Sequence, residues 1–508
     1  MSDLINQARH QILAARSRIY KVSGATPLQE ATLPDGTQVF IKREDLSPIN
    51  AYKWRGAYNR MAVLDEGERA KGVVTASAGN HAQGVALAAR ELGVKARIFM
   101  PVSTPMMKQN AVRRIGGNAV EVILVGDTYD DASGAAKAEA KASGKTYVAP
   151  YDDLHVIGGQ GTIADEIVMS GKGPFDVAYL PIGGGGLAAG VATWLRYYYP
   201  DMKIYGVEGV DQACMKAAIE AGKPVHLDYL DVFCDGTAVR QAGDITFPLC
   251  RDLLDGIVTV TNEEVCAGIQ WLWEQKRCIP EPAGALSVTA MLKDRETCRG
   301  KRVVTIVCGA NMDFSQLAWI ARHSRIGEAT RKFFRFEIGE THGSLLGLME
   351  GFLRELPISE FQYGKSHATR AWPVIGFDAS PEELADLETR LRSAGIPYED
   401  VTAARNVDVD FRIIKYKADL MPGAIFVALD FHERKGALQD FLTLARPLAN
   451  ICYFNYSYTG ERVGRALLGL EFKSPDAEAG FREVMRHPEH HAWRSCREVD
   501  ASVRKRIL

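Results

Sequence analysis

Short apolar stretches alternate with longer amphipathic stretches over the first part of the chain. The apolar runs have the length of strands, and the segments that follow them have helical spacing. The expected strand and helix pairs are 72–75 with 82–92, 96–100 with 105–115, 118–125 with 129–143 and 177–182 with 187–199, and a further strand is expected at 303–307. This alternation predicts a parallel sheet with helices on both faces. Ligands of such sheets bind where a strand ends and the next helix begins.

The rest of the chain contains an internal repeat with a constant offset of 93 residues. Three anchors align at that offset: Gly343-Ser344-Leu345 with Gly436-Ala437-Leu438, Phe361-Gln362-Tyr363 with Phe454-Asn455-Tyr456, and Gly376 with Gly469. One offset across separate anchors indicates a duplicated module. Each copy begins with an expected strand (334–338 and 425–431), followed by a helix (344–353 and 437–448), two strands and a second helix (381–394 and 476–486).

These patterns predict a catalytic domain over residues 1–325, with a smaller subdomain of about 53–155 inserted in it. Modules over 326–418 and 419–508 follow. Neither module contains a cluster of nucleophile and base, so two interpretations remain: a packing or dimerisation appendage, or a pair that senses a ligand. We favour sensing, because two copies create a mutual interface.

Composition limits the class of protein. Hydrophobic residues make up 46% and charged residues 24% of the chain, and the net charge is −2. These values are typical of a globular protein and give no electrostatic reason to expect nucleic acid or an anionic membrane as a partner. The uncharged run 177–195 contains Pro181 and the four consecutive glycines 183–186, which argue against a membrane span. The N-terminus lacks a secretory signal, and nine scattered cysteines fit reduced thiols, so we expect a cytoplasmic protein without a metal site.

The strongest local signal is the run Gly183-Gly184-Gly185-Gly186 between an expected strand and an expected helix. Glycines let successive N–H groups surround an anion, and the helix start adds its positive end. A phosphate is therefore expected here. A dinucleotide site is a poorer match, because its glycines have the spacing G-x-G-x-x-G. A flexible turn without a ligand is the alternative.

Two further segments carry polar groups near expected strand ends. The segment 75–84 reads TASAGNHAQG, in which Ser77, Gly79 and Asn80 offer donors that suit a carboxylate. Asn80 also suits a phenolic oxygen, whereas a lone histidine such as His81 is more often a cap or a packed side chain. Lys53 stands between Tyr52 and Trp54, and such apolar surroundings lower an amine's pKa, as Schiff-base chemistry requires. Taken alone, such a lysine is more often a solvated helix residue.

Four motifs in this order resemble one family. They are KREDL at 42–46, TASAGNHAQG at 75–84, the glycine run with Leu187, and EPAGA at 281–285. Together they resemble the fold-type II pyridoxal-phosphate enzymes, and most closely the biosynthetic threonine dehydratases. The resemblance implies an α/β fold: a tryptophan-synthase-β-like catalytic domain with two parallel-type sheets, followed by two ACT-like βαββαβ modules.

The resemblance also implies roles for individual residues. Lys53 is expected to hold pyridoxal 5'-phosphate covalently and to act as the catalytic base. The phosphate is expected at Gly183, Gly184, Gly185, Gly186 and Leu187, and the substrate carboxylate at Ser77, Ala78, Gly79, Asn80 and His81. Asn80 is expected to contact the pyridine hydroxyl, and Cys308 to face the pyridine nitrogen. Cys308 alone would be taken for an inert core thiol, and Glu281 matches a motif residue without an assigned role.

The activity implied is the conversion of L-threonine to 2-oxobutanoate and ammonia, the first step towards isoleucine. Isoleucine is expected to inhibit at the ACT-like pair and valine to oppose it, with Tyr363 and Tyr456 as effector contacts. The family's Phe-Asn-Tyr pattern is kept at 454–456 but reads Phe-Gln-Tyr at 361–363. A homotetramer is usual in the family. Relatives with a divalent cation carry a second carboxylate where this chain has Cys214, so no metal is expected.

Three positions around Lys53 leave the substrate open. The family usually has Ser-Phe before this lysine and Leu or Ile after it, whereas this chain has Ala51, Tyr52 and Trp54. A dehydratase or racemase for another 3-hydroxy amino acid, for example serine, is therefore an alternative. A catalytically inactive amino-acid sensor is a second alternative, against which the intact Lys53, Asn80 and glycine run argue.

Overall fold

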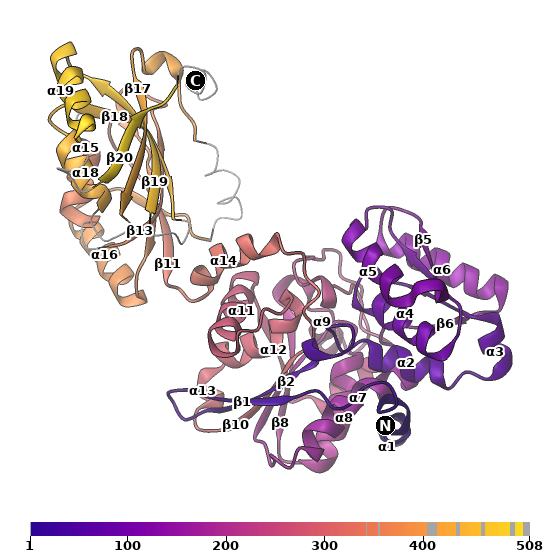
Figure 1. Cartoon of the computed structure of the whole chain (residues 1–508). Coiled ribbons are helices and arrows are strands. Elements are labelled where there is room, and N and C mark those ends of the chain that lie inside the picture. The colour runs from indigo at the N-terminus through magenta and orange to yellow at the C-terminus, as the bar shows by residue number, and fades with distance from the viewer. Residues whose placement is uncertain are drawn as a thin grey trace. The chain divides into compact units, whose positions relative to one another are not determined.

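The computed structural model describes residues 2–341, 343–353, 356–403, 414–432, 437–458, 463–487 and 493–500. The chain divides into two compact units, Met1–Gly327 and Glu328–Leu508 (Figure 1). Across these described ranges, no helix combines the length and the apolar character that a bilayer crossing requires.

A six-stranded sheet forms the centre of the first unit. Its order is β1 (Leu28–Thr32), β2 (Gln38–Arg43), β10 (Arg302–Val307), β7 (Val177–Pro181), β8 (Lys203–Gly209) and β9 (Gly256–Val260). All neighbours are parallel except β1, which runs antiparallel to β2. Its central strands are buried on both sides, as expected of a sheet that helices cover on both faces.

Alternate residues of β7 show the two cores. Ala178 and Leu180 pack in a cluster with α1 (Ser2–Ile19), α7 (Leu154–Met169), α8 (Gly186–Tyr198) and α10 (Thr246–Leu253). Val177 and Tyr179 pack in another with α11 (Asn262–Lys276), α12 (Pro282–Lys293) and α14 (Gln316–Gly327). The period of two along the strand thus divides its side chains between two helical layers.

A second, four-stranded parallel sheet is built from residues between β2 and β7. Its order is β5 (Val120–Leu124), β4 (Ala96–Met100), β3 (Val73–Ala76) and β6 (Thr146–Tyr147). The helices of this part of the chain are α2 (Trp54–Ala62), α3 (Glu66–Lys71), α4 (Asn80–Leu92), α5 (Met106–Gly116) and α6 (Tyr129–Ser143). The first three predicted strands belong to this sheet and the last two to the larger one, so the predicted α/β class with two parallel-type sheets is confirmed.

Short helices complete the first unit. They are η1 (Glu44–Leu46), η2 (Gly117–Ala119), η3 (Val210–Gln212), α9 (Cys214–Ala221), η4 (Asp235–Thr237) and α13 (Arg295–Cys298). All nine cysteines lie in the described part of the chain, where they are buried and form no disulfide bond.

The second unit is an eight-stranded antiparallel sheet, and most of its helices are gathered on one face (Figure 1). The strands, in sheet order, are β16 (Tyr398–Asp400), β11 (Arg331–Phe336), β15 (Val374–Asp378), β13 (Ile358–Gly364), β18 (Ala449–Ser457), β19 (Val463–Phe472), β17 (Ile425–His432) and β20 (Trp493–Glu498). The helices are α15 (Ser344–Leu348), the π-helix η5 (Met349–Leu353), α16 (Pro381–Ser393), η6 (Ala418–Leu420), α18 (Ala437–Ala445) and α19 (Pro475–Arg486). The strands β12 (Ile338–Gly339) and β14 (Arg370–Ala371) form a separate two-stranded antiparallel sheet.

The duplicated module is visible in this sheet. Both copies follow the order strand, helix, strand, strand, helix, strand, from β11 to β16 and from β17 to β20. The equivalent strands β13 and β18 pair antiparallel, with Gln362 opposite its repeat counterpart Asn455. Tyr363 is opposite Phe454, and Phe361 is opposite Tyr456. This register relates the two copies by a local two-fold axis, and the predicted βαββαβ pattern is confirmed.

Candidate active site

The four glycines form the turn between β7 and α8. Gly185 has a φ of +98°, which favours glycine, and a Cβ on Gly184 would lie 2.3 Å from the Tyr151 ring. The carbonyl groups of the turn are held by side-chain donors: Cys214 Sγ to Gly183 at 3.4 Å, Thr246 Oγ1 to Gly184 at 2.5 Å and Cys250 Sγ to Gly185 at 3.8 Å. With Leu187 in the first turn of α8, this shaped loop and helix start fit a phosphate.

Lys53 lies directly before α2, and burial lowers the pKa of its amine. Among the described residues, its Nζ atom makes no hydrogen bond or ion pair. Lys42 is fully buried, and burial lowers its pKa too, but its Nζ atom donates to Thr26 O at 2.6 Å and to Glu166 Oε2 at 2.5 Å. Lys53, which is half-buried, is therefore the lysine of the two whose amine is available to an aldehyde.

The segment before Lys53 pairs with the segment that follows β10. Tyr52 N donates to Cys308 O at 3.1 Å, and Ala51 forms a β-bridge with Gly309. Cys308 is 3% exposed, and its thiol donates to Ala283 O at 3.3 Å. Burial, together with Glu281, raises the pKa of this thiol well above its ordinary value. Cys308 therefore keeps its proton and lies beside the lysine segment, at the end of a buried strand.

Asn80 is held by two partners from the end of the first unit. Its Nδ2 donates to Glu281 Oε1 at 2.6 Å, and its Oδ1 accepts from Asn311 Nδ2 at 2.8 Å. Asn311 N also donates to Glu281 Oε2 at 3.1 Å. These bonds set the orientation of the Asn80 amide and leave one N–H of Nδ2 for another acceptor. Burial, with a contribution from Asp235, raises the pKa of Glu281 to about 7.

The loop between β3 and α4 contains the residues expected to hold a carboxylate. Ser77, Ala78 and Gly79 are partly exposed, and Gly79 N donates to Ser77 Oγ at 3.1 Å. His81 is 3% exposed, and its Nε2 lies 3.1 Å from both Thr75 Oγ1 and Val148 O. Burial and the nearby Lys53 lower its pKa to about 3. The ring of His81 is thus a packed neutral group, while its backbone lies in the first turn of α4.

A cavity of about 500 Å³ brings several of these groups together. It is lined by Gly79, Asn80, Gln83, Met107, Lys108, Asn110, Ala111, Arg114, Asp235, Gly236, Glu281, Ala310, Asn311 and Met312. Lys108 on α5 and Asp235 on η4 form an ion pair at this cavity. Sequence reasoning did not identify Lys108 or Asp235, because they come from separate segments and no motif joins them. Gln83 lies within the 75–84 motif, but no role was assigned to it.

The region where some relatives hold a cation is occupied by a helix start. Both oxygens of Glu208 accept backbone N–H bonds, from Met215 at 2.8 Å and from Lys216 at 2.9 Å. Cys214, the first residue of α9, lies beside them. Within the described ranges, no group of three histidine, cysteine or acidic side chains is arranged to hold a metal ion.

The two predicted effector tyrosines have different surroundings. Tyr363 lines a small cavity, in which its hydroxyl donates to Glu340. The ring of Tyr456 is 2% exposed and packs 5.5 Å from that of Phe431. Phe431 occupies the repeat position of Ile338, which lines the cavity beside Tyr363, so a larger side chain fills the equivalent space in the second copy. Gly436 of the second copy lies outside the described residues.

Each of the two units matches a known protein family. A family model described as pyridoxal-phosphate dependent enzyme matches residues 19–309. A second model, described as the C-terminal regulatory domain of threonine dehydratase, matches residues 322–408 and 422–494.

Among curated proteins, the chain is similar to the biosynthetic L-threonine dehydratase of Burkholderia multivorans, with 38% identity over 91% of this chain and 92% of that one. It is 36% identical to the Escherichia coli protein of the same description, over 92% of each chain. Among solved structures, threonine deaminase isoform 2 of Solanum lycopersicum has 41% identity and a TM-score of 0.61, covering 64% of this chain and 94% of that one. Maize serine racemase has 29% identity and a TM-score of 0.57, covering 63% and 98%.

Proposed function

The chain belongs to the biosynthetic threonine dehydratase family of pyridoxal-phosphate-dependent enzymes, and from this premise we propose that it converts L-threonine to 2-oxobutanoate and ammonia. Membership confirms the resemblance found in the four sequence motifs. The observation that carries the proposal is Lys53: a half-buried lysine whose amine lies over the Tyr52 ring and makes no hydrogen bond or ion pair among the described residues, beside the neutral thiol of Cys308. In this reaction class, such an amine holds the cofactor and moves a proton.

We assign the cofactor contacts to residues whose geometry fits them. Lys53 would form the covalent link, and the N–H groups from Gly183 to Leu187 would hold the phosphate. The free N–H of Asn80 would serve the ring hydroxyl, and Cys308 would serve the pyridine nitrogen. When bound, the cofactor acts as an electron sink for negative charge at the substrate α-carbon.

The remaining steps belong to the side chains of this chain. The Lys53 amine would be the base that removes the substrate α-proton, and its lowered pKa keeps it uncharged more readily for that task. The backbone N–H groups from Ser77 to His81 and the start of α4 hold the substrate carboxylate. Glu281 fixes the amide of Asn80. The neutral thiol of Cys308 does not hold the pyridine nitrogen protonated as a carboxylate would, which suits β-elimination.

Isoleucine is the proposed inhibitor, and it binds in the second unit. The small cavity there is lined by Glu340, Tyr363 and Asn450, and by the apolar side chains of Ile338, Leu345 and Ile451. A carboxylate beside an amide and an apolar wall matches the ammonium group and branched side chain of an amino acid. The open space is only about 20 Å³, enough for roughly one water, so isoleucine would have to widen the cavity as it binds. Residues 338–373 of the cavity belong to the first copy, and Asn450 and Ile451 to the second. Valine is proposed to oppose the inhibition, and Tyr456 to contribute from the second copy.

The cellular compartment, the oligomeric state and the domain boundaries are also proposals. Nine buried thiols without a disulfide bond suit a reducing cytoplasm. A homotetramer is the assembly that the family resemblance favours. The two predicted domain boundaries near 325 and 418 stay proposals as well, although the first lies close to the division at Gly327.

Serine is the second candidate substrate. The similarity to maize serine racemase over the first unit favours it, as do Tyr52 and Trp54 beside Lys53. An assay for 2-oxobutanoate from threonine and for pyruvate and D-serine from L-serine, with and without isoleucine, separates the candidates. Faster turnover of threonine, inhibited by isoleucine, supports the proposal; faster turnover of serine supports the alternative. Absence of any product, with no cofactor bound, supports an inactive sensor.

A further inference from the structure

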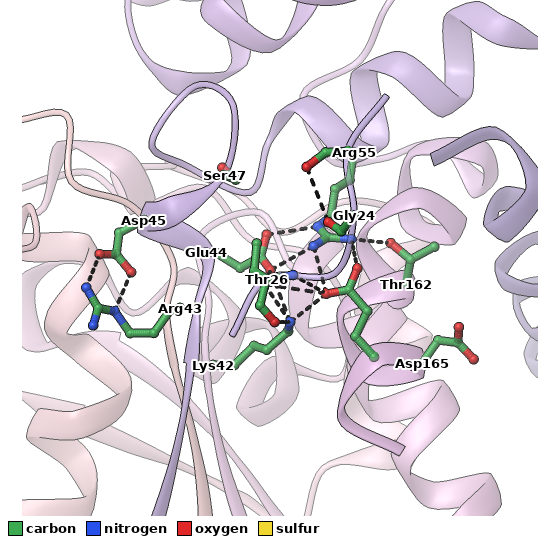
Figure 2. Close-up of polar contacts among 12 residues, drawn as sticks. Gly24, Thr26, Lys42, Arg43, Glu44, Asp45, Ser47, Arg55, Thr162 and Asp165 are labelled. Carbon is green, nitrogen blue, oxygen red and sulfur yellow. Dashed lines mark hydrogen bonds and ion pairs between the residues drawn. The ribbon is translucent and has the colours of Figure 1, made fainter. Parts of the chain in front are cut away.

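Four charged side chains form a closed cluster inside the first unit (Figure 2). They are Lys42, Glu44, Arg55 and Glu166, with side-chain exposures of 1%, 0%, 0% and 2%. Two cations face two carboxylates, so the cluster carries no net charge. None of these residues lines the cavity or belongs to the proposed chemistry.

Arg55 uses every N–H donor of its guanidinium group. Nε and Nη2 donate to the two oxygens of Glu44 at 2.8 and 2.9 Å. Nη1 and Nη2 donate to the two oxygens of Glu166 at 2.6 and 3.0 Å, and Nη1 also donates to Thr162 Oγ1 at 3.1 Å. Arg55 thus forms two forked contacts at once, with carboxylates from different elements.

Lys42 closes the cluster from the other side. Its three bonds are to Thr26 O at 2.6 Å, Thr26 Oγ1 at 2.5 Å and Glu166 Oε2 at 2.5 Å. Thr26 Oγ1 donates in turn to Glu44 Oε1 at 2.5 Å. Burial acts to raise the pKa of Glu44, but Arg55 and Lys42 outweigh it and hold that pKa below its ordinary value.

A cluster of this kind is a poor source of stability. Removing charges from water is costly, and well-packed apolar replacements of a buried ion pair are often neutral or stabilising. What the cluster supplies is geometry, because forked bonds are satisfied in one arrangement only. The elements that it joins therefore indicate its role.

One side of the cluster leads to Lys53 and to the glycine turn. Arg55 is two residues after Lys53, in the first turn of α2, and Glu166 lies on α7. Helices α2 and α7 touch, because a Cβ on Gly159 would lie 2.5 Å from Arg55 O. Helix α7 packs as closely on α8, where a Cβ on Gly190 would lie 2.5 Å from Ile157 O. Helix α8 begins in the glycine turn.

The other side of the cluster leads to Cys308. Lys42 lies on β2 and Glu44 directly follows this strand. Strand β2 pairs with β10 in parallel, so that Arg43 is opposite Val307, the residue before Cys308. The cluster thus connects the elements that carry three of the four predicted cofactor contacts, which are Lys53, the glycine turn and Cys308; the fourth, Asn80, is held by Glu281 and Asn311.

We propose that Lys42, Glu44, Arg55 and Glu166 form a positioning cluster, which sets Lys53 at a fixed distance from the glycine turn and Cys308. The inference rests on the proposed function, in that Lys53 is the lysine linked to the cofactor. The cluster acts through geometry, since none of its four side chains is among the groups that shift the pKa of Lys53.

Arg55→Lys tests the proposal in the holoenzyme, because it keeps the charge and loses both forks. We expect release of pyridoxal phosphate to an apo-enzyme acceptor to become on the order of tenfold faster. The visible circular dichroism band of the bound cofactor should also weaken. Arg43→Lys is the matched control. Arg43 is the neighbour of Lys42 on β2, and its Nε and Nη2 donate to the two oxygens of Asp45 at 2.8 and 2.6 Å, apart from the cluster (Figure 2). Its release rate should stay within about twofold of the unaltered enzyme.

Equal release rates for Arg55→Lys and Arg43→Lys, or an unchanged rate for Arg55→Lys, would overturn the proposal. If Arg55→Lys does not fold, Thr162→Val and Thr162→Ser replace it. The valine variant loses the hydrogen bond with Arg55 and should release the cofactor faster. The serine variant keeps the hydroxyl and should release the cofactor at the rate of the unaltered enzyme. Equal release rates for the two variants would contradict the proposal. Borohydride labelling of the unaltered enzyme separates this outcome from failure of the proposed function, since only the latter predicts no label on Lys53.

Discussion

Asn80 Nδ2 donates a hydrogen bond of 2.6 Å to Oε1 of Glu281, a residue 201 positions later in the chain. Asn80 begins α4, which follows a strand of the smaller sheet, and Glu281 stands directly before α12, which packs on the larger sheet. The bond therefore joins the two halves of the first unit at the wall of the cavity. It gives a physical role to the motif glutamate, which the sequence left without one.

Glu281→Gln should change both the pH dependence of stability and the cofactor spectrum. The pKa of Glu281 is raised from 4.5 to about 7, mainly by burial, so the folded protein keeps a proton there that the unfolded chain has lost. Its stabilisation is present at low pH and is lost as the pH rises through about 7. Glutamine has no such proton, so the unfolding temperature of the variant holoenzyme should fall less between about pH 5 and about pH 8.

Glu208→Gln is the control for that variant, since burial also raises the pKa of Glu208 to about 7, away from the cavity. Both variants should flatten the pH profile, but only Glu281→Gln should shift the visible absorbance of the cofactor. A spectral shift in both variants, or in neither, would contradict the assigned link between Glu281 and Asn80.

Cys308→Asp should slow elimination. A carboxylate at this position would hold a proton on the pyridine nitrogen, whereas the buried thiol donates to Ala283 O and remains neutral. We expect kcat with threonine to fall about tenfold or more, equivalent to about 1.4 kcal/mol of barrier. Cys308→Ser, which keeps a neutral donor, should retain most of the activity. Unchanged turnover in Cys308→Asp would refute the role of the thiol.

Gly184→Ala should weaken cofactor binding, because its methyl group would lie 2.3 Å from the Tyr151 ring. Displacing the turn removes N–H groups from the phosphate, and we expect the Kd for pyridoxal phosphate to rise by at least about tenfold, or about 1.4 kcal/mol. Gly134→Ala on α6, where nothing lies within 4 Å of the added atom, is the control. Fluorescence titration of the apo-enzyme measures both; equal affinities would place the phosphate elsewhere.

Tyr363→Phe should weaken inhibition by isoleucine without changing turnover in its absence. The change removes the hydroxyl that bonds Glu340 in the small cavity, and we expect the half-inhibiting concentration to rise by about tenfold. Tyr398→Phe removes a hydroxyl that donates to Glu388 in the same module and should leave inhibition unchanged.

Isothermal titration provides the second readout for this site. Because coupling is reciprocal, a non-reacting threonine analogue should weaken isoleucine binding to the unaltered enzyme. Isoleucine affinity that does not depend on the analogue would show that the two sites are not coupled.

The elements with local signals could be predicted from the sequence. Helix α6 begins and ends where the pattern placed it, at Tyr129 and Ser143, and Thr128 and Asp131 form the capping box that starts it. The glycine turn was predicted for the same reason, since its four residues are consecutive. Lys53 could be selected only through the family resemblance, because a lysine beside two aromatic residues is common on helix surfaces.

Contacts between distant segments could not be predicted. In the KREDL motif, Lys42 and Glu44 face the buried cluster, while Arg43 and Asp45 pair with each other. The period of two along β2 predicts that Lys42 and Arg43 point to opposite sides, whereas Glu44 and Asp45 lie beyond the strand, in η1. The partner Glu166, however, is 124 positions from Lys42 and has no signal of its own. The ion pair of Lys108 and Asp235 was missed for the same reason.

Residues at equivalent positions of the two repeat copies have different surroundings. Tyr363 and Tyr456 occupy the same repeat position, but the neighbouring position is Ile338 in one copy and Phe431 in the other. The predicted helix 344–353 also changes to a π-helix at Met349, which the apolar pattern alone does not distinguish from a regular helix.

Borohydride reduction of the holoenzyme, followed by digestion and mass spectrometry, tests the central claim most directly. Reduction makes the lysine–cofactor bond permanent, so the modified peptide identifies the lysine. We predict the label on Lys53 and none on Lys42, whose amine is fully bonded to Thr26 and Glu166. A label on any other lysine, or no label on a protein that has bound the cofactor, would contradict the account.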